Sequence, residues 1–197
     1  MTARIGVLAL QGGVSEHLEA LGRVGAETVP VRTPADLIGL DGIVLPGGES
    51  SVLDKLMRLF EVRDPLIALL RAGLPAYGTC AGLILLADTV LDAVPGQQSL
   101  GGLPVTVRRN AFGSQAHSFD TTLEFSGIDH LVAATFIRAP LIVAVSPETE
   151  VVATLDDGSI VAARYGRLLG TSFHPELTGD DSVHRYFLEM VLAAKNG

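Results

Sequence analysis

The single cysteine of this chain, Cys80, lies between two glycines in the pattern Gly-Thr-Cys-Ala-Gly (Gly78–Gly82). A predicted strand precedes it and a predicted helix follows it, which is the thiol counterpart of the Gly-x-Ser-x-Gly nucleophile elbow. The free N–H groups and partial positive charge of a helix N-terminus favour the thiolate over the thiol. The local pattern fits a reactive nucleophile, and it fits a buried cysteine that only fills space.

A cysteine nucleophile needs a base, and the base needs a group that orients it. His174 is the best candidate base, because it directly follows a predicted strand and precedes Pro175 and Glu176. Pro175 biases His174 toward extended geometry, in which residues two apart project to the same side. Glu176 can then hold the far nitrogen of the imidazole. The other four histidines lack such a neighbour and are expected to be surface or otherwise satisfied polar residues: His17, His117, His130 and His184.

A third feature is a further strand-to-helix turn, with the sequence Leu-Pro-Gly-Gly-Glu-Ser-Ser (Leu45–Ser51). We predict Ser50 or Ser51 as the helix N-cap. Exposed N–H groups at such a turn suit a carboxylate, a phosphate or a developing oxyanion. Phosphate is the weakest of these, because Glu49 would repel it. Gln11–Gly13 is a weaker version of the same turn.

Short apolar runs rich in β-branched residues alternate with helical patterns through the first half of the chain. Continuous apolar strands joined by helical crossovers are typical of a parallel sheet covered by helices on both faces. We predict strands at residues 4–10, 28–31, 42–45 and 74–77, and helices at 14–24, 50–60, 62–71 and 81–88.

Closely spaced strands in the second half predict an antiparallel extension, with a hairpin turn at 156–159. We therefore expect one α/β domain over residues 1–197, a flavodoxin-like three-layer sandwich with a mostly parallel central sheet. The turns after its first, third and fourth strands would meet at the carboxyl edge of the sheet, where open α/β sheets bind ligands. The remaining strands are predicted at 105–108, 121–125, 132–136, 142–145, 151–155, 160–164 and 168–172, with a last helix at 180–194.

The composition excludes several classes of protein. With 48% hydrophobic residues among 197, the chain can offset the entropy of ordering and is not intrinsically disordered. A net charge of −8 with no large basic cluster argues against a nucleic-acid partner. We find no apolar run of about 18 residues and no signal-peptide core, so we expect no membrane partner and a cytoplasmic location. A lone cysteine builds neither an intramolecular disulfide nor a thiolate metal site, and we expect no metal and no cofactor.

The turn around Cys80 and the segment Phe173–Glu176 together resemble the class I (triad) glutamine amidotransferases. The stretch Gly42–Ser51 narrows the resemblance to the PdxT/SNO family, the glutaminase subunits of pyridoxal 5′-phosphate synthase. The resemblance runs from about residue 4 to the last helix, with small departures at Ser51 and Val52, where the family usually has Thr and a small residue, and at Ala111, where Ser is common. Further matching stretches are Gly6–Gly12, Arg109–Gly113, Phe136–Pro140 and Ser172–Thr178.

The resemblance implies that Cys80 attacks the side-chain amide of glutamine, that His174 moves the protons and that Glu176 orients His174. Water then hydrolyses the thioester. The ammonia would pass to a separate (β/α)8-barrel synthase subunit that makes pyridoxal 5′-phosphate, and the free glutaminase would be poorly active until that subunit docks. The resemblance assigns glutamine binding to Gly48, Glu49, Ser50, Arg109, Ile137 and Arg138, the oxyanion hole to Gly47, Gly48 and Ala81, and part of the docking edge to Gln11 and Gly12.

Three alternatives remain at this point. The chain could be a glutaminase that serves another synthase, such as one for purines or histidine. It could be a non-catalytic α/β scaffold, which the intact Cys80, His174 and Glu176 argue against. It could also be a cysteine hydrolase of the flavodoxin-like peptidase or deglycase type, although in those proteins a histidine directly follows the cysteine.

Overall fold

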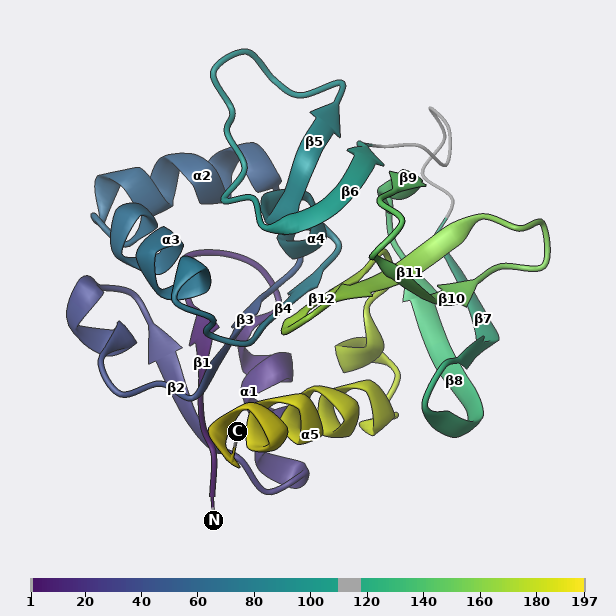
Figure 1. Cartoon of the computed structure of the whole chain (residues 1–197), viewed down its shortest axis with the longest axis horizontal. Coiled ribbons are helices and arrows are strands. Elements are labelled where there is room, and N and C mark those ends of the chain that lie inside the picture. Colours follow the sequence, from purple (N-terminus) through teal and green to yellow (C-terminus); the bar gives the residue numbers. More distant parts are fainter. Residues whose placement is uncertain (1, 110–117, 197) are drawn as a thin grey trace.

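Five parallel strands form one side of the main sheet in this computed structural model, which describes residues 2–109 and 118–196 (Figure 1). They lie in the order β2-β1-β3-β4-β12, so only β3 and β4 lie between the first and the last strand of the chain. Their bounds are β1 Arg4–Leu8, β2 Glu27–Val31, β3 Gly42–Leu45, β4 Ala76–Thr79 and β12 Leu168–Thr171.

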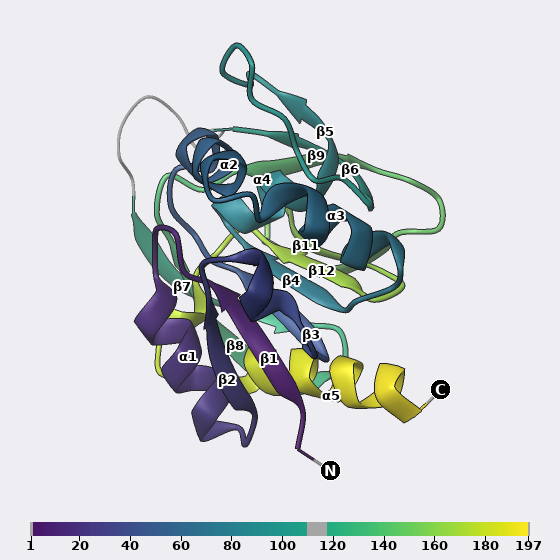
Figure 2. The same cartoon turned by 90° about the vertical axis from the view of Figure 1, so that its left-hand side faces the viewer.

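Helices cover both faces of this sheet (Figure 2). Alternate residues of a strand point to opposite faces, so a sheet covered on both sides needs apolar residues at every position. In β1, Ile5 and Val7 pack into the core shared with α1 and α5, while Leu8 packs into the core on the other face. The first face carries α1 (Val14–Arg23) and α5 (Ser182–Asn196), and the second carries α2 (Ser50–Leu59), α3 (Arg63–Arg71) and α4 (Ala81–Leu86).

Beyond β12 the sheet becomes mixed. Strand β11 runs antiparallel to β12, and β9, β6 and β5 continue the sheet outward, while β10 forms a hairpin with β11. Strands β7 and β8 make a separate antiparallel ribbon. The bounds are β5 Ala87–Leu91, β6 Leu103–Arg108, β7 Phe119–Phe125, β8 Ile128–Phe136, β9 Leu141–Val145, β10 Glu150–Thr154 and β11 Ile160–Tyr165, with 3-10 helices η1 Pro34–Leu37 and η2 Pro175–Leu177.

The predicted α/β class, the mostly parallel sheet with helices on both faces and the hairpin at 156–159 are confirmed. The helix predicted to reach residue 88 is wrong at its end: α4 stops at Leu86, and Ala87–Leu91 forms β5 by parallel pairing with β6. Strand β4 starts two residues later than predicted, because Pro75 has no N–H to give to the ladder. The single domain over residues 1–197 stays a prediction. No helix in the described ranges is long and apolar enough to cross a membrane.

Candidate active site

The turn between β4 and α4 places Cys80 at a strained position. Its φ of 49° and ψ of −100° lie in a region that residues with a side chain rarely adopt. The close approach of helix to sheet depends on Gly82, because a Cβ there would overlap the backbone carbonyl of Leu45. Ala81 is the first residue of α4, so its N–H is one of the free donors at the helix start. The elbow predicted around Cys80 is therefore present.

The pairing of β4 with β12 brings His174 to Cys80. The two strands are parallel neighbours with Thr171 opposite Thr79, and the Cys80 N–H donates to the Thr171 carbonyl at 2.8 Å. The chain leaves β12 and reaches His174 three residues later, where the nearby Cys80 thiol helps to raise the pKa of the imidazole. The His174 N–H donates to the carbonyl of Thr135 in β8 at 2.8 Å, and this hydrogen bond fixes the backbone of the segment that carries His174.

Glu176 follows at the start of η2, and its Oε1 lies 2.8 Å from Nδ1 of His174. The side chains of His174 and Glu176 are 11% and 1% exposed. Because an ionised carboxylate only accepts hydrogen bonds, this contact assigns the Nδ1 proton to His174 and leaves Nε2 as the ring nitrogen that can exchange a proton with the thiol. His174 thus interacts with the Cys80 thiol and hydrogen-bonds the Glu176 carboxylate.

Burial opposes charge on His174 and Glu176, but their contacts outweigh it. Burial alone would lower the pKa of His174, while the hydrogen bonds with Cys80 and Glu176 raise that pKa to about 10. Burial would raise the pKa of Glu176, whereas His17 and His174 hold that pKa far below its usual range. The pair is therefore built to carry an imidazolium and a carboxylate at neutral pH.

The turn after β3 lies against the same imidazole. A Cβ on Gly47 would lie 3.0 Å from Nδ1 of His174 and closer still to Cε1, so only glycine leaves room for this ring. The Oε1 atom of Gln11 accepts the N–H of Glu49 at 3.1 Å, which joins the turn after β1 to the turn after β3. The predicted N-cap is wrong: Glu49 caps α2, accepting the Ser51 N–H at 3.4 Å, because its longer side chain can fold back over the first turn.

The residues that the sequence assigns to glutamine binding fall into two groups. Arg109 lies at the end of β6 with its side chain 8% exposed, and it pairs with Glu49 at 2.6 Å. Ser50 is buried as the first residue of α2. Ile137 and Arg138 directly follow β8, where Ile137 is half-buried and Arg138 is exposed with a φ of 44°.

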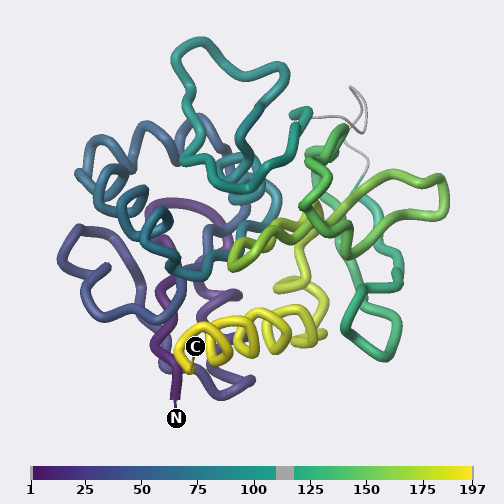
Figure 3. The backbone as a smooth tube through the Cα atoms, viewed as in Figure 1, coloured from purple at the N-terminus to yellow at the C-terminus, as the bar shows by residue number. Residues whose placement is uncertain are grey.

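Sequence reasoning missed Gln97, which joins two of these residues. Its Oε1 accepts from Arg109 at 2.8 Å, and its Nε2 donates to the hydroxyl of Ser50 at 2.9 Å. Gln97 lies in the segment between β5 and β6, which arches away from the sheet and returns beside α2 (Figure 3). No local pattern identifies a single glutamine in such a segment.

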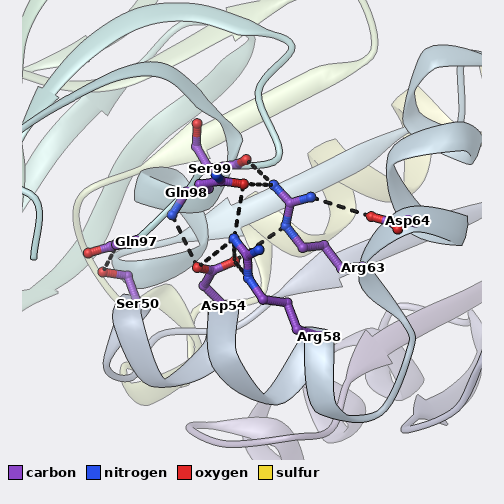
Figure 4. A network of polar contacts seen from close by, with 8 residues as sticks. All are labelled: Ser50, Asp54, Arg58, Arg63, Asp64, Gln97, Gln98 and Ser99. Carbon is purple, nitrogen blue, oxygen red and sulfur yellow. Dashed lines mark hydrogen bonds and ion pairs between the residues drawn. The ribbon is translucent and has the colours of Figure 1, made fainter. Parts of the chain in front are cut away.

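A buried carboxylate anchors this segment on α2 (Figure 4). Asp54 accepts the N–H of Gln98 at 3.1 Å and pairs with Arg58 at 3.1 Å and with Arg63 at 3.3 Å. Arg63 also donates to the carbonyl of Ser99 at 3.1 Å. This network fixes the backbone next to Gln97, so the position of Gln97 is set from outside the site.

Two of the histidines that the sequence left aside are buried next to the triad. His17 of α1 and His184 of α5 are fully buried and hydrogen-bond each other at 2.9 Å. His130 is exposed on β8. His117 and Ala111 lie outside the described residues. No group of His, Cys, Asp and Glu side chains in the described ranges could hold a metal ion.

Comparison with known proteins identifies the family. The model of the SNO glutamine amidotransferase family matches residues 7–193, nearly the whole chain. This chain belongs to that family. A relative from Clavibacter michiganensis subsp. michiganensis, named pyridoxal 5′-phosphate synthase subunit PdxT, is 56% identical over 188 residues, which cover 95% of this chain and 90% of the relative. The relative of the same name from Cutibacterium acnes is 55% identical over 197 residues, with 97% and 98% covered.

A solved structure at 44% identity agrees with this membership, and a more distant one shows the same fold. A crystal structure of a glutamine amidotransferase superimposes on this family member with a TM-score of 0.89 at 44% identity, covering 95% of this chain and 98% of the other. PurLQS from Thermotoga maritima shares the fold at 18% identity, with a TM-score of 0.67 over 98% of this chain and 97% of the other.

Proposed function

We propose that this amidotransferase hydrolyses L-glutamine to L-glutamate and ammonia with Cys80 as nucleophile, His174 as acid and base, and Glu176 as the group that orients His174. The observation that carries the proposal is the continuous chain from the Cys80 thiol through His174 to Glu176, built at the carboxyl edge of adjacent parallel strands. The backbone N–H groups and arginines around these three residues can bind the negative charges of the substrate and of the reaction.

The first half of the reaction forms a thioester. The thiolate of Cys80 attacks the amide carbon of glutamine, and the carbonyl oxygen takes up the negative charge. When the tetrahedral intermediate collapses, His174 gives its Nε2 proton to the leaving nitrogen, and ammonia departs. Water then attacks the thioester carbon and gives a proton to His174, and glutamate leaves as the thiolate is restored.

Two turns are placed to bind the charges of the reaction. The N–H of Ala81 and an N–H of Gly47 or Gly48 serve as the oxyanion hole, because they belong to the turns that enclose Cys80 and His174. Arg109 and Arg138 are the cations for the substrate carboxylate, and an arginine can bind a carboxylate in bidentate fashion. The glutamine pocket is completed by Gly48, Glu49, Ser50 and Ile137. Gln97 holds the Ser50 hydroxyl and the Arg109 guanidinium in position through its two hydrogen bonds.

The ammonia has a synthase as its destination. Relatives at 55–56% identity are named as subunits of pyridoxal 5′-phosphate synthase, so we assign this chain the same assembly, with a (β/α)8-barrel partner. Gln11 and Gly12 are our candidates for its docking edge, because Gln11 contacts the turn that carries the oxyanion hole. We place the reaction in the cytoplasm, where a lone thiol stays reduced.

The decisive experiment measures glutamate release with and without the synthase subunit, for wild type and Cys80→Ala. We expect synthase-dependent release from wild type and none from Cys80→Ala, while the variant still binds the synthase. Full activity of Cys80→Ala would overturn the mechanism. Activity that depends on a purine or histidine synthase instead would assign the chain to another pathway, and failure of 6-diazo-5-oxonorleucine to label Cys80 in the complex would support a scaffold.

A further inference from the structure

Two buried histidines lie directly behind the carboxylate of Glu176, and the proposed mechanism uses neither. The Nε2 atom of His17 is 3.4 Å from Oε1 of Glu176 and 3.1 Å from the hydroxyl of Thr79, the residue before Cys80. The Nδ1 atom of His17 is 2.9 Å from Nε2 of His184. The side chains of His17 and Glu176 are 0% and 1% exposed, so water does not supply these contacts.

The hydrogen-bond partners select one arrangement of protons in this chain. A lone pair on Nε2 of His17 would face the Glu176 carboxylate, so that nitrogen carries the proton and donates to it. The Nδ1 of His17 is then an acceptor, and Nε2–H of His184 donates to it. The Nδ1 of His184 has no hydrogen-bond partner in the described part of the chain, which suits a bare lone pair better than a buried N–H.

We propose that His17 is a positioning residue for the triad: its Nε2–H, set by the hydrogen bond from His184, holds the Glu176 carboxylate ionised and oriented toward His174. The inference rests on the proposed glutaminase mechanism and adds a group to it. His17 acts through Glu176 and touches neither the substrate nor the reacting atoms.

Burial makes this support necessary. Oε1 of Glu176 receives His174 and His17, and its Oε2 has no hydrogen-bond partner in the described ranges. A buried carboxylate with a single donor is costly to keep charged. The hydrogen bonds from His17 and His174 both lower the Glu176 pKa.

The other charged and titratable groups around Glu176 do not replace His17. Tyr77 packs edge-on against His17 and His184, and its own hydroxyl bonds Thr171. Burial is the largest cause that lowers the pKa of His184, to about 3, so His184 is neutral at working pH. Glu16 lies beyond Gly13 and would add negative charge, and a Cβ on Gly13 would be 3.6 Å from its carboxylate.

The experiment follows the reactivity of Cys80 against pH. Iodoacetamide alkylation of the free chain reports the thiolate, and glutamate release reports turnover in the complex with the synthase. In His17→Leu the lost donor raises the Glu176 pKa, so the carboxylate is neutralised at higher pH and His174 loses its charge partner. We expect the acid limb of both profiles to move up by about one pH unit or more, with about a 10-fold loss of rate near neutral pH.

The matched controls separate positioning from damage to the fold. His130→Leu makes the same change on an exposed histidine and should leave both profiles unchanged. The amide of His17→Gln reaches the Nε2 position beside Glu176, while that of His17→Asn reaches the Nδ1 position beside His184. We expect Gln to restore the wild-type limb and Asn to leave it shifted, and this pair of variants decides the question even when the leucine variant does not fold.

Each outcome has one meaning. A lower rate with an unshifted acid limb in His17→Leu, or equal profiles for the Gln and Asn variants, would overturn the inference. If wild type with the synthase releases no glutamate, the proposed function fails, and the alkylation profile still tests the control of Cys80 by His17.

Discussion

Gly47→Ala adds one methyl group to the turn after β3 and tests the position of His174. The backbone φ of Gly47 lies outside the left-handed region, so alanine is allowed there, and every backbone N–H of the turn is kept. The new Cβ would lie 3.0 Å from Nδ1 of His174 and closer to Cε1, against an ordinary contact of about 3.5–4.0 Å. The ring must therefore move by about 1 Å, away from its hydrogen bond with Glu176 at 2.8 Å.

A displacement of about 1 Å in a catalytic group costs about 100-fold in rate. Over-packing of this kind also costs about 1–3 kcal/mol of the free energy of unfolding. We expect glutamate release in the complex to fall by about 100-fold with little change in KM for glutamine, while thermal unfolding still shows a folded protein. Gly22→Ala is the control, because nothing lies within 4 Å of a Cβ there. Wild-type turnover in Gly47→Ala would refute the placement of His174 against this turn.

Three further predictions concern other parts of the site. Gln97→Leu removes the hydrogen bond at 2.8 Å that holds Arg109, and we expect KM for glutamine to rise by about 5–30-fold with kcat nearly unchanged; an unchanged KM would contradict this role. Asp54→Ala leaves two arginines without their carboxylate, and urea unfolding should show a loss of about 3 kcal/mol; a loss close to zero would show that the network does not anchor the segment. The extra stability of wild type over Glu176→Gln should be fully present near pH 6, because it needs the carboxylate ionised and His174 protonated. It should decline as pH rises from about 6.5 toward 10, since the partners of His174 raise its pKa to about 10. Thermal unfolding measured against pH checks this, and a difference in stability that does not change with pH would contradict the pairing.

Local signals in the sequence were sufficient for the elements that carry the site. The glycines around Cys80 and the proline after His174 act through their own backbone geometry, which does not depend on the rest of the fold. Apolar periodicity likewise identified the buried strands β1 and β3, because a sheet covered on both faces requires it. These features are determined within a few residues, so they can be predicted from the sequence.

Contacts between distant segments needed the tertiary structure. The pairing of β4 with β12, which joins Cys80 to His174, closes a loop of about 90 residues that no local pattern specifies. Strand β5 forms by pairing with β6, and the sequence pattern alone had placed its first two residues in the preceding helix.

The roles of the buried polar groups depend on partners from distant segments. His17 looked like an ordinary helix residue, since its partners Glu176 and His184 are more than 150 residues away. Gln97 carried no signal for the same reason, because its role is set by Asp54 and Arg109 on other elements. The sequence by itself was enough to select the candidate nucleophile, base and orienting carboxylate, since that selection depends on residue type and local geometry. Only the tertiary structure decided which residues hold them, because that support comes from segments brought together by folding.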